Sequence, residues 1–452
     1  MKRTVLVSLL IIVLLFASLS SVAAKPKKGA IGVNVLLNTD VTDAILGDLG
    51  GYGKVLDVLY EVNALTMRVK ADDVAAIEAL PYVVSVSPDA ERKGAPIDTV
   101  FVEDFTGGLS TWNLDAIDVT PEPGFGRSVS YTGEGVYVAV LDTGLVDLWR
   151  QYFPEERIAE EYAISFGGGG GDRGTVSTQP NKWEHDTHSH GTHVTSTILG
   201  YSLGGTPING VAPRVNIIPV KVLNQNGSGW SSVVARGIEY IGDLKAGPLA
   251  DYPVIINMSL GGPVLDPVEK AAIDYAIEQG VIIVSSAGNE GEAGMGYPAA
   301  YEPVISVAAS GWAGEWLIGP WWYVLDVNEP TNPANFYITD FSSRELAGQD
   351  LDVAAPGSWI VGPYQLQMGK TSYYFLGGTS MASPHVAGTV ALMAQKYPDL
   401  TASQAELILE SNAIYLPPGT LTLPATGETF TWGADATGSG LLDADAALAA
   451  TP

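Results

Sequence analysis

The sequence contains no cysteine, and only five of its 452 residues are histidine. A chain without cysteine has no disulfide bonds, no thiol nucleophile and no zinc site with sulfur ligands. Packing, with or without bound ions, must therefore hold the folded chain together. A chain of this length is large enough to bury a full hydrophobic core.

Basic residues are also scarce, because 23 Lys and Arg stand against 50 Asp and Glu and leave a net charge of -27. So acidic a surface repels nucleic-acid phosphates and anionic membranes, and no nucleic-acid partner is expected. Carboxylates also offer oxygen ligands to divalent cations. The composition is compatible with structural Ca²⁺, although the sequence assigns it no ligands.

Long apolar runs are absent except at the N-terminus. Lys2 and Arg3 precede an apolar run that ends in small residues, with Val22 and Ala24 suited to a signal peptidase. The pattern predicts a cleaved signal peptide over residues 1–24, a secreted, extracellular protein and no membrane association after cleavage. The alternative is a retained anchor, because the run is near the shortest length that spans a bilayer.

Residues 25–105 are predicted to form one small domain and a linker. The strands are predicted in AIGVNVLL, KVLDVLYEV, ALTMRVK and YVVSVSPD, and the helices in VTDAILGDL and ADDVAAIEALP. The order βαββαβ is that of a ferredoxin-like α+β domain. The following stretch, ERKGAPIDTVFVEDFTGG, has the composition of a linker.

Residues 106–452 show a different pattern. Near-continuous apolar runs alternate with helical patterns, among them GVYVAVLDTG, VNIIPVKVLN, YPVIINMSLGG, GVIIVSSAGN and PVEKAAIDYAIEQG. This alternation is typical of an α/β fold, a mainly parallel sheet with helices on both faces. Active sites of such sheets lie beyond the carboxyl ends of the strands, where Asp142, Ser259 and Asn289 fall.

Two stretches of this region do not fit the alternation. The glycine-rich residues 166–183 are predicted to form a surface loop. Residues 311–337 hold four tryptophans and are predicted to form a loop that packs over the sheet edge or the N-terminal domain. The alternative for the second stretch is a surface that binds substrate.

Four of the five histidines lie in one stretch, HDTHSHGTH, from His185 to His193. The spacings of three residues do not match the HExxH pattern of a zinc helix, and a transition-metal site is disfavoured. His193, and His385 further along, lie inside predicted helices and are interpreted as structural. His185 and His188 are interpreted as loop residues, with a role near a substrate as the alternative for both.

A serine nucleophile needs a base, the base needs an orienting carboxylate, and the oxyanion needs hydrogen-bond donors. The chain offers a carboxylate, Asp142 in VAVLDTG, at the end of a predicted strand. It also offers His190 in HSHGTHVTS and Ser380 in GGTSMASPHVAG, and these two residues each lie at the start of a predicted helix. Free N–H groups and the helix dipole at such a helix start favour the negative oxygen. Taken singly, Asp142 and Ser380 could be caps, and Asn289 a turn residue.

The stretches VLDTG, HGTHV and GTSMASPHVAG, in this order, resemble the three signatures of the subtilisin-like serine proteases, the subtilase family. The resemblance implies a serine endopeptidase that works through an acyl-enzyme without a cofactor, with Ser380 as nucleophile, His190 as base and Asp142 as orienting carboxylate. It implies that Asn289, in SSAGNEG, and the Ser380 backbone N–H bind the oxyanion.

These signatures have two alternative interpretations. A catalytically silent relative that only binds peptides remains an alternative, although all four of these residues are present. An esterase of the α/β-hydrolase class would need GxSxG around its nucleophile and the order Ser, Asp, His, whereas here the order is Asp, His, Ser and the stretch at Ser380 reads GTSMA.

The same resemblance implies where protein or peptide substrates bind. The segment Ser259, Leu260 and Gly261 would pair with an extended peptide as an added strand. Ala287, Gly288 and Gly296 would line the pocket for the residue before the scissile bond (P1). Because glycine and alanine leave room there, a large apolar or aromatic P1 residue is expected.

The resemblance also implies that the N-terminal domain is an inhibitory propeptide that assists folding of a monomeric enzyme, with self-cleavage between about residues 98 and 111. An unrelated small domain is the alternative.

Two features depart from the family. The stretch ILGYSLGGTPINGVAP lacks the usual asparagine pattern of a calcium loop, and Gln151 stands where an acidic ligand is common.

Overall fold

The computed structural model describes residues 29–93, 98–102, 110–120, 126–170, 174–366 and 369–452. The predicted signal peptide, residues 1–24, lies outside the described residues. Within the described ranges, no helix has both the length and the apolar character that crossing a bilayer requires.

The N-terminal module is the predicted βαββαβ unit. Its elements are β1 (Ala30–Leu37), α1 (Asp43–Leu49), β2 (Gly53–Leu59), β3 (Ala64–Lys70), the 3-10 turn η1 (Ala71–Asp73), α2 (Val74–Glu78) and β4 (Val83–Pro88). The strands form an antiparallel sheet in the order β2-β3-β1-β4. Alternate residues such as Val33, Val35 and Leu65 point to one face and form the module's own core.

The body is built on a sheet of nine described strands. Their path is β17 (Phe336–Ile338), β16 (Ile305–Trp312), β15 (Val281–Ser286), β14 (Val254–Met258), β7 (Tyr137–Asp142), β12 (Asn216–Lys221), β8 (Ile164–Gly167) and β9 (Ser177–Thr178), and β18 (Val353–Pro356) pairs with β16. The pairs from β8 to β16, and β16 with β18, are parallel, whereas β17 and β9 are antiparallel. This confirms the mainly parallel sheet.

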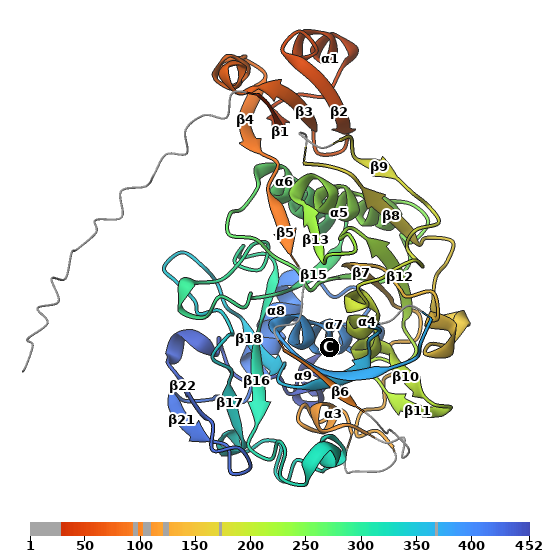
Figure 1. Cartoon of the computed structure of the whole chain (residues 1–452), viewed down its shortest axis with the longest axis vertical. Coiled ribbons are helices and arrows are strands. Elements are labelled where there is room, and N and C mark those ends of the chain that lie inside the picture. The colour runs from red at the N-terminus through yellow and green to blue at the C-terminus, as the bar shows by residue number, and fades with distance from the viewer. Residues whose placement is uncertain (1–28, 94–97, 103–109, 121–125, 171–173, 367–368) are drawn as a thin grey trace, which may run out of the picture.

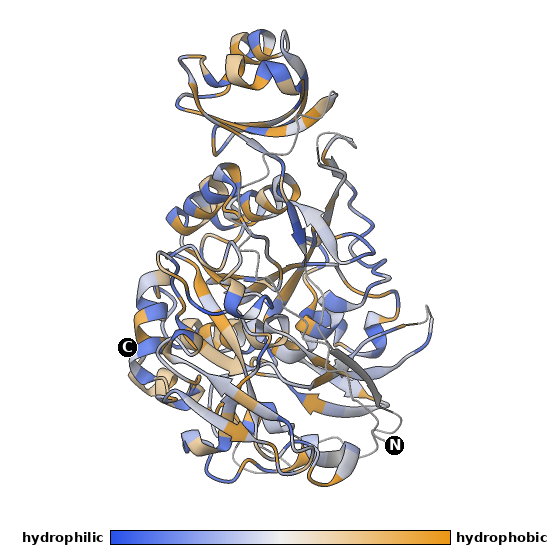
Figure 2. Cartoon of the chain, turned by 60° about the vertical axis from the view of Figure 1, so that its left-hand side comes forward, coloured by the Kyte–Doolittle hydropathy of each residue, from blue (hydrophilic) through white to orange (hydrophobic). Residues whose placement is uncertain are grey.

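Helices cover both faces of this sheet, as predicted. They are α4 (His190–Leu199), α5 (Ser231–Ala246), α6 (Pro267–Glu278), α7 (Thr379–Lys396), α8 (Ala402–Asn412) and α9 (Ala444–Ala450), with the short α3 (Trp112–Asp115). Along β7, Val138 and Val140 belong to the core under α4 and α7, whereas Ala139 and Leu141 belong to the core under α5 and α6. The strands are therefore apolar on both sides, and Figure 2 shows orange strands inside the body.

The remaining elements lie outside this sheet. The strands are β5 (Glu91–Lys93) with β13 (Ser228–Trp230), β6 (Asp98–Val102) with β20 (Tyr373–Gly377) and β19 (Ile360–Pro363), β10 (Gly200–Leu203) with β11 (Thr206–Asn209), and β21 (Gly419–Thr422) with β22 (Thr429–Trp432). The 3-10 turns are η2 (Trp149–Gln151), η3 (Glu155–Arg157), η4 (Gly291–Ala293), η5 (Gly319–Val324), η6 (Pro333–Asn335) and η7 (Ala434–Ala436).

The module rests on the body at α5 and α6, at one end of the molecule (Figure 1). Leu59 and Ala64 of its sheet join the core under these two helices. Asn34 is buried and donates from Nδ2 to Asp266 Oδ2 over 2.9 Å, and Arg236 of α5 pairs with Asp57 over 2.7 Å. Apolar and polar contacts thus join the two parts.

The tryptophan-rich stretch packs at the sheet edge. It begins in β16 and ends in β17, so its two ends are strands and not loop, and η5 lies between them. The ring of Trp322 stacks on Phe375 at 5.6 Å and lies 5.8 Å from Trp112. The aromatic side chains of this stretch therefore pack this end of the sheet against α3 and β20.

Candidate active site

Asp142 and His190 meet at the carboxyl edge of the sheet. Asp142 is the last residue of β7, and His190 is the first residue of α4. His190 Nδ1 lies 2.8 Å from Asp142 Oδ1 and 2.9 Å from Oδ2, and both side chains are fully buried. The backbone N–H of Thr143 also donates to Asp142 Oδ1, over 2.6 Å. The carboxylate therefore fixes the ring and favours a proton on Nδ1.

Ser380 is the second residue of α7, a helix that packs against α4. Its Oγ donates to the carbonyl of Ser259 over 3.2 Å, and only 3% of the residue is exposed. His190 Nε2 is buried and has no hydrogen-bond partner among the described residues. The imidazole thus keeps Nε2 free to accept a proton, while the Ser380 hydroxyl is bonded to the Ser259 carbonyl. A hydrogen bond between a catalytic serine and its histidine often forms only when substrate is present.

Asn289 lies beside the start of α7. Its Oδ1 accepts hydrogen bonds from Thr379 N over 2.9 Å and from Thr379 Oγ1 over 3.0 Å, and these bonds turn Nδ2 toward Gly378. A Cβ placed on Gly378 would lie 3.7 Å from both Asn289 Nδ2 and the backbone N of Ser380. Asn289 Nδ2 and the backbone N of Ser380 therefore lie on the same side of Gly378, and both are potential hydrogen-bond donors.

A cavity of about 780 Å³ opens next to Ser380. It is lined by Ala90, Glu91, Leu260, Gly261, Gly262, Pro263, Val264, Ser286, Gly288, Asn289, Glu290, Ala293, Gly294, Met295, Gly296, Gln349, Thr379 and Ser380. Of the residues expected to bind substrate, Leu260, Gly261, Gly288 and Gly296 line it directly. Ser259 and Ala287 are buried behind it, where Ala287 accepts a hydrogen bond from the Gly296 N–H over 2.8 Å.

The other histidines have distinct surroundings. His193 is fully buried and its Nε2 lies 3.0 Å from the Ile360 carbonyl, and His385 is buried with Nδ1 2.9 Å from the Met381 carbonyl. Burial lowers the pKa of His193 to about 3 and that of His385 to about 4. Both match the predicted structural role. His185 is exposed and pairs with Asp147 at 2.8 Å.

His188 is closer to the site than its loop position suggested. Its ring centroid lies 6.1 Å from that of His190, and burial lowers its pKa to about 4. The loop before His190 is fixed by Asp186, whose sequence position suggested only a possible metal ligand. The carboxylate of Asp186 accepts from the backbone N–H groups of His188 and Ser189, each over 2.8 Å, and from Thr143 Oγ1 over 2.7 Å.

Two residues near the end of the N-terminal module were also not anticipated. Asp89 accepts from Ser232 N over 2.9 Å and from Gly170 N over 2.7 Å, at the start of α5. Gly170 belongs to the stretch predicted as a surface loop, but it is buried against the Trp230 ring. A Cβ atom added to Gly170 would lie only 2.4 Å from that ring. Arg92 of β5 is fully buried against α6. The partners of Asp89 and Arg92 are distant in sequence, so no local pattern could have predicted these contacts.

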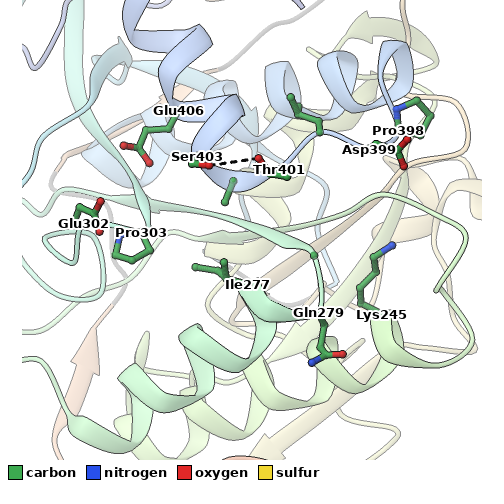
Figure 3. Close-up of a pocket in the computed structure, with 13 residues that line it drawn as sticks. Lys245, Ile277, Gln279, Glu302, Pro303, Pro398, Asp399, Thr401, Ser403 and Glu406 are labelled. Atoms are coloured by element: carbon green, nitrogen blue, oxygen red, sulfur yellow. Dashed lines mark hydrogen bonds between the residues drawn. The ribbon is translucent and has the colours of Figure 1, made fainter. Parts of the chain in front are cut away.

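One group of acidic side chains could hold a cation. Asp350, Asp352 and Glu406 bring carboxylate oxygens within 4.8 Å of one another. Asp352 Oδ1 is buried without a partner among the described residues, so this oxygen is available as a ligand for a divalent cation. Glu406 also borders a second cavity of about 430 Å³, on the side where Glu302 projects (Figure 3). This cavity shares no lining residue with the one at Ser380.

Comparison with known proteins gives one consistent result. Residues 133–440 match the family described as the Subtilase family. Subtilisin E of Bacillus subtilis is 32% identical over 370 residues, which cover 80% of this chain and 79% of that protein. The thermostable alkaline protease of Halalkalibacterium halodurans is 34% identical over 286 residues, 63% of each chain.

Solved structures agree. Fervidolysin from Fervidobacterium pennivorans, a keratinolytic enzyme related to subtilisin, matches with a TM-score of 0.64 and 25% identity over 94% of this chain and 62% of its own. Sphericase matches with a TM-score of 0.55 and 27% identity over 75% of this chain and 99% of its own. The chain belongs to the subtilase family and is a serine endopeptidase with a subtilisin-like fold.

Proposed function

We propose that this chain is a secreted endopeptidase whose catalytic residues are Asp142, His190 and Ser380. The observation that carries the assignment is the buried His190 ring, which is bonded through Nδ1 to both Asp142 oxygens while Nε2 has no partner among the described residues. An imidazole held in this way can take a proton from a serine hydroxyl.

The reaction follows from these positions. Ser380 Oγ attacks the carbonyl carbon of the substrate and its proton passes to His190 Nε2, which leaves a tetrahedral intermediate with a negative oxygen. His190 then gives the proton to the leaving amine as the C–N bond breaks, and the acyl group stays on Ser380. Water, deprotonated by His190, hydrolyses this ester and restores the hydroxyl. Throughout, Asp142 stabilises the imidazolium.

A direct test is digestion of casein by the purified protein with and without a covalent inhibitor directed at serine. We expect the inhibitor to stop hydrolysis and to label one residue, Ser380, in a peptide map. Hydrolysis that continues unchanged after full labelling would contradict the assignment.

Asn289 is proposed to donate from Nδ2 to the oxyanion, together with the Ser380 N–H. Asn289→Leu is expected to lower kcat by about 10²- to 10³-fold with little change in KM, because the bond forms mainly in the transition state. Steady-state kinetics on a chromogenic peptide measure both constants.

Asn181→Leu is the control, because Asn181 is an exposed residue outside the cavity. It should keep the original kcat. A rise in KM alone in Asn289→Leu would assign the residue to ground-state binding. Thermal unfolding of both variants reports whether the loss of the Thr379 bonds has damaged the fold.

The pocket lined by Gly288 and Gly296 is proposed to take a large apolar or aromatic P1 residue. Their lack of side chains leaves space in the cavity beside Ser380, and Met295 adds an apolar surface. Sequencing of the products from a mixed protein digest reads the P1 profile. A profile dominated by Arg or Lys at P1 would contradict this proposal.

The N-terminal module with its linker, residues 25–105, is proposed to be an inhibitory propeptide that assists folding of the catalytic domain, residues 106–452. Its support is the strand β5, which lies beside β13 (Figure 1) and pairs with it. Ala90 and Glu91 line the cavity that also contains Ser380. While this segment is present, the edge of β13 is already paired, so an extended substrate peptide cannot add there. Half of the proposed self-cleavage window, residues 98–111, lies outside the described residues, and the position of β5 favours the N-terminal end of this window.

Structural Ca²⁺ is proposed at Asp350, Asp352 and Glu406, whose carboxylates it would hold together. Chelation by EDTA is expected to lower the thermal unfolding midpoint by several degrees, because bound ions stabilise only the folded state. Scanning calorimetry of the Ser380→Ala protein, with Ca²⁺ added back as the control, avoids self-digestion. An unfolding midpoint that EDTA leaves unchanged would contradict a calcium site.

A further inference from the structure

The strand β5 carries a buried arginine into the substrate cleft. Arg92 Nε donates to Glu269 Oε1 and Oε2 over 3.2 and 2.9 Å, and Nη2 donates to the same carboxylate and, over 3.0 Å, to the Val264 carbonyl. Both side chains of this pair are 0% exposed. A fully buried, charged pair of this kind joins residues far apart in the sequence.

The groove that holds Arg92 is continuous with the active site. Gly262 and Val264, which contact Arg92, line the same cavity as Ser380. A Cβ on Gly262 would lie 2.8 Å from Arg92 Nη1, so the absence of a side chain there makes room for the guanidinium. The carboxylate of Glu269, on the first turn of α6, forms the charged end of this groove.

The backbone contacts of β5 carry no sequence preference. Lys93, Arg92 and Glu91 pair with Ser228, Gly229 and Trp230 as antiparallel strands. Any extended peptide can add to β13 in this way once β5 has left. The selectivity at this position must therefore come from the side chain that enters the groove.

We infer that Glu269 makes this groove a subsite for an arginine side chain of the substrate, on the N-terminal side of the scissile bond. The inference rests on the proposed function and adds a specificity to it. An apolar side chain in the groove would bury the carboxylate without a partner, which is costly, whereas arginine restores the charge-assisted bonds.

The geometry favours arginine over lysine. Two nitrogens of the guanidinium bond the Glu269 carboxylate while one of them also bonds the Val264 carbonyl. The compact ammonium of lysine cannot reproduce this planar arrangement. Asp266, at the start of α6, adds a second negative charge near the guanidinium. Selection should therefore follow the order arginine, lysine, then neutral residues.

A positional library of peptides tests this on the wild-type enzyme, with leucine fixed at P1 and each upstream position varied. We expect one upstream position at which arginine raises kcat/KM by about 30-fold or more over leucine and glutamine. If peptides are cut but no upstream position prefers arginine, the inference is overturned and the proposed function stands. If no peptide is cut, both fail.

The variant Glu269→Leu is made together with Arg92→Leu, because a lone buried charge in the precursor could prevent folding. The ratio of kcat/KM for arginine over leucine at the selected position should then fall to about one or below. The matched control is Glu278→Gln, which removes an exposed carboxylate from the same helix and should keep the arginine preference. An arginine preference that survives Glu269→Leu would leave the pair as a latch for β5 alone and overturn the inference.

Discussion

Ser380→Ala is expected to lower kcat for casein or a peptide by about 10⁶-fold, the magnitude known for subtilisin, to which this chain is similar. Without Oγ no acyl-enzyme forms, and the remaining rate comes from binding and the oxyanion donors. The same change should leave the precursor uncut. Steady-state kinetics and intact-mass spectrometry measure the two effects.

The control for this variant is Ser403→Ala, which removes an exposed hydroxyl on α8. It should keep both turnover and processing. Identical cleavage of the precursor in wild type and in Ser380→Ala would rule out self-processing, although the enzyme assignment would survive. Hydrolysis of peptides by Ser380→Ala at the wild-type rate would remove the assignment itself.

His190→Ala is expected to lower kcat by a similar factor, because it removes the base that is proposed to accept the Ser380 proton. His185→Ala should keep most of the activity, since its exposed side chain bonds only to Asp147 in the described structure. Comparison of kcat for the two variants separates the members of HDTHSHGTH. Equal losses in both would contradict a single catalytic histidine.

The pH dependence gives the same test without a variant at the site. Activity should fall in acid, because an imidazole that already carries a proton cannot accept one from serine. Burial lowers the pKa of His188 to about 4 and that of His193 to about 3, so both stay neutral above about pH 5. The acid loss should persist unchanged in His185→Ala. A profile that is flat from neutral to strongly acid pH would contradict a histidine base.

The fold could be predicted from sequence in two cases, where a strand is buried on both faces of its sheet and where buried and exposed residues alternate along it. The apolar run ending in Asp142 predicted a central parallel strand, and β7 has neighbours on both sides and helices on both faces. The βαββαβ order of the module was also predicted correctly, because apolar residues alternate along its strands and recur every three to four residues along its helices. The glycine-rich stretch misled, since Gly170 is buried against Trp230 and bonds Asp89 across the chain.

The sequence alone determined the residue types of the chemistry. Asp142, His190 and Ser380 lie in short local signatures, and a signature is visible wherever its function requires particular side chains next to each other. It also determined the acidic composition and, through the lack of cysteine, the absence of disulfide bonds. These properties do not depend on how distant segments meet.

Only the tertiary structure decided how the cleft is filled and charged. It brought Glu269 and Arg92 together across 177 positions, and it placed Asn289 Nδ2 and the backbone N of Ser380 beside Gly378. No local pattern marks such a pair, because a glutamate on the first turn of a helix is ordinary in sequence. Its meaning depends on burial beside an arginine from another part of the chain, which only the packing of β5 against α6 creates.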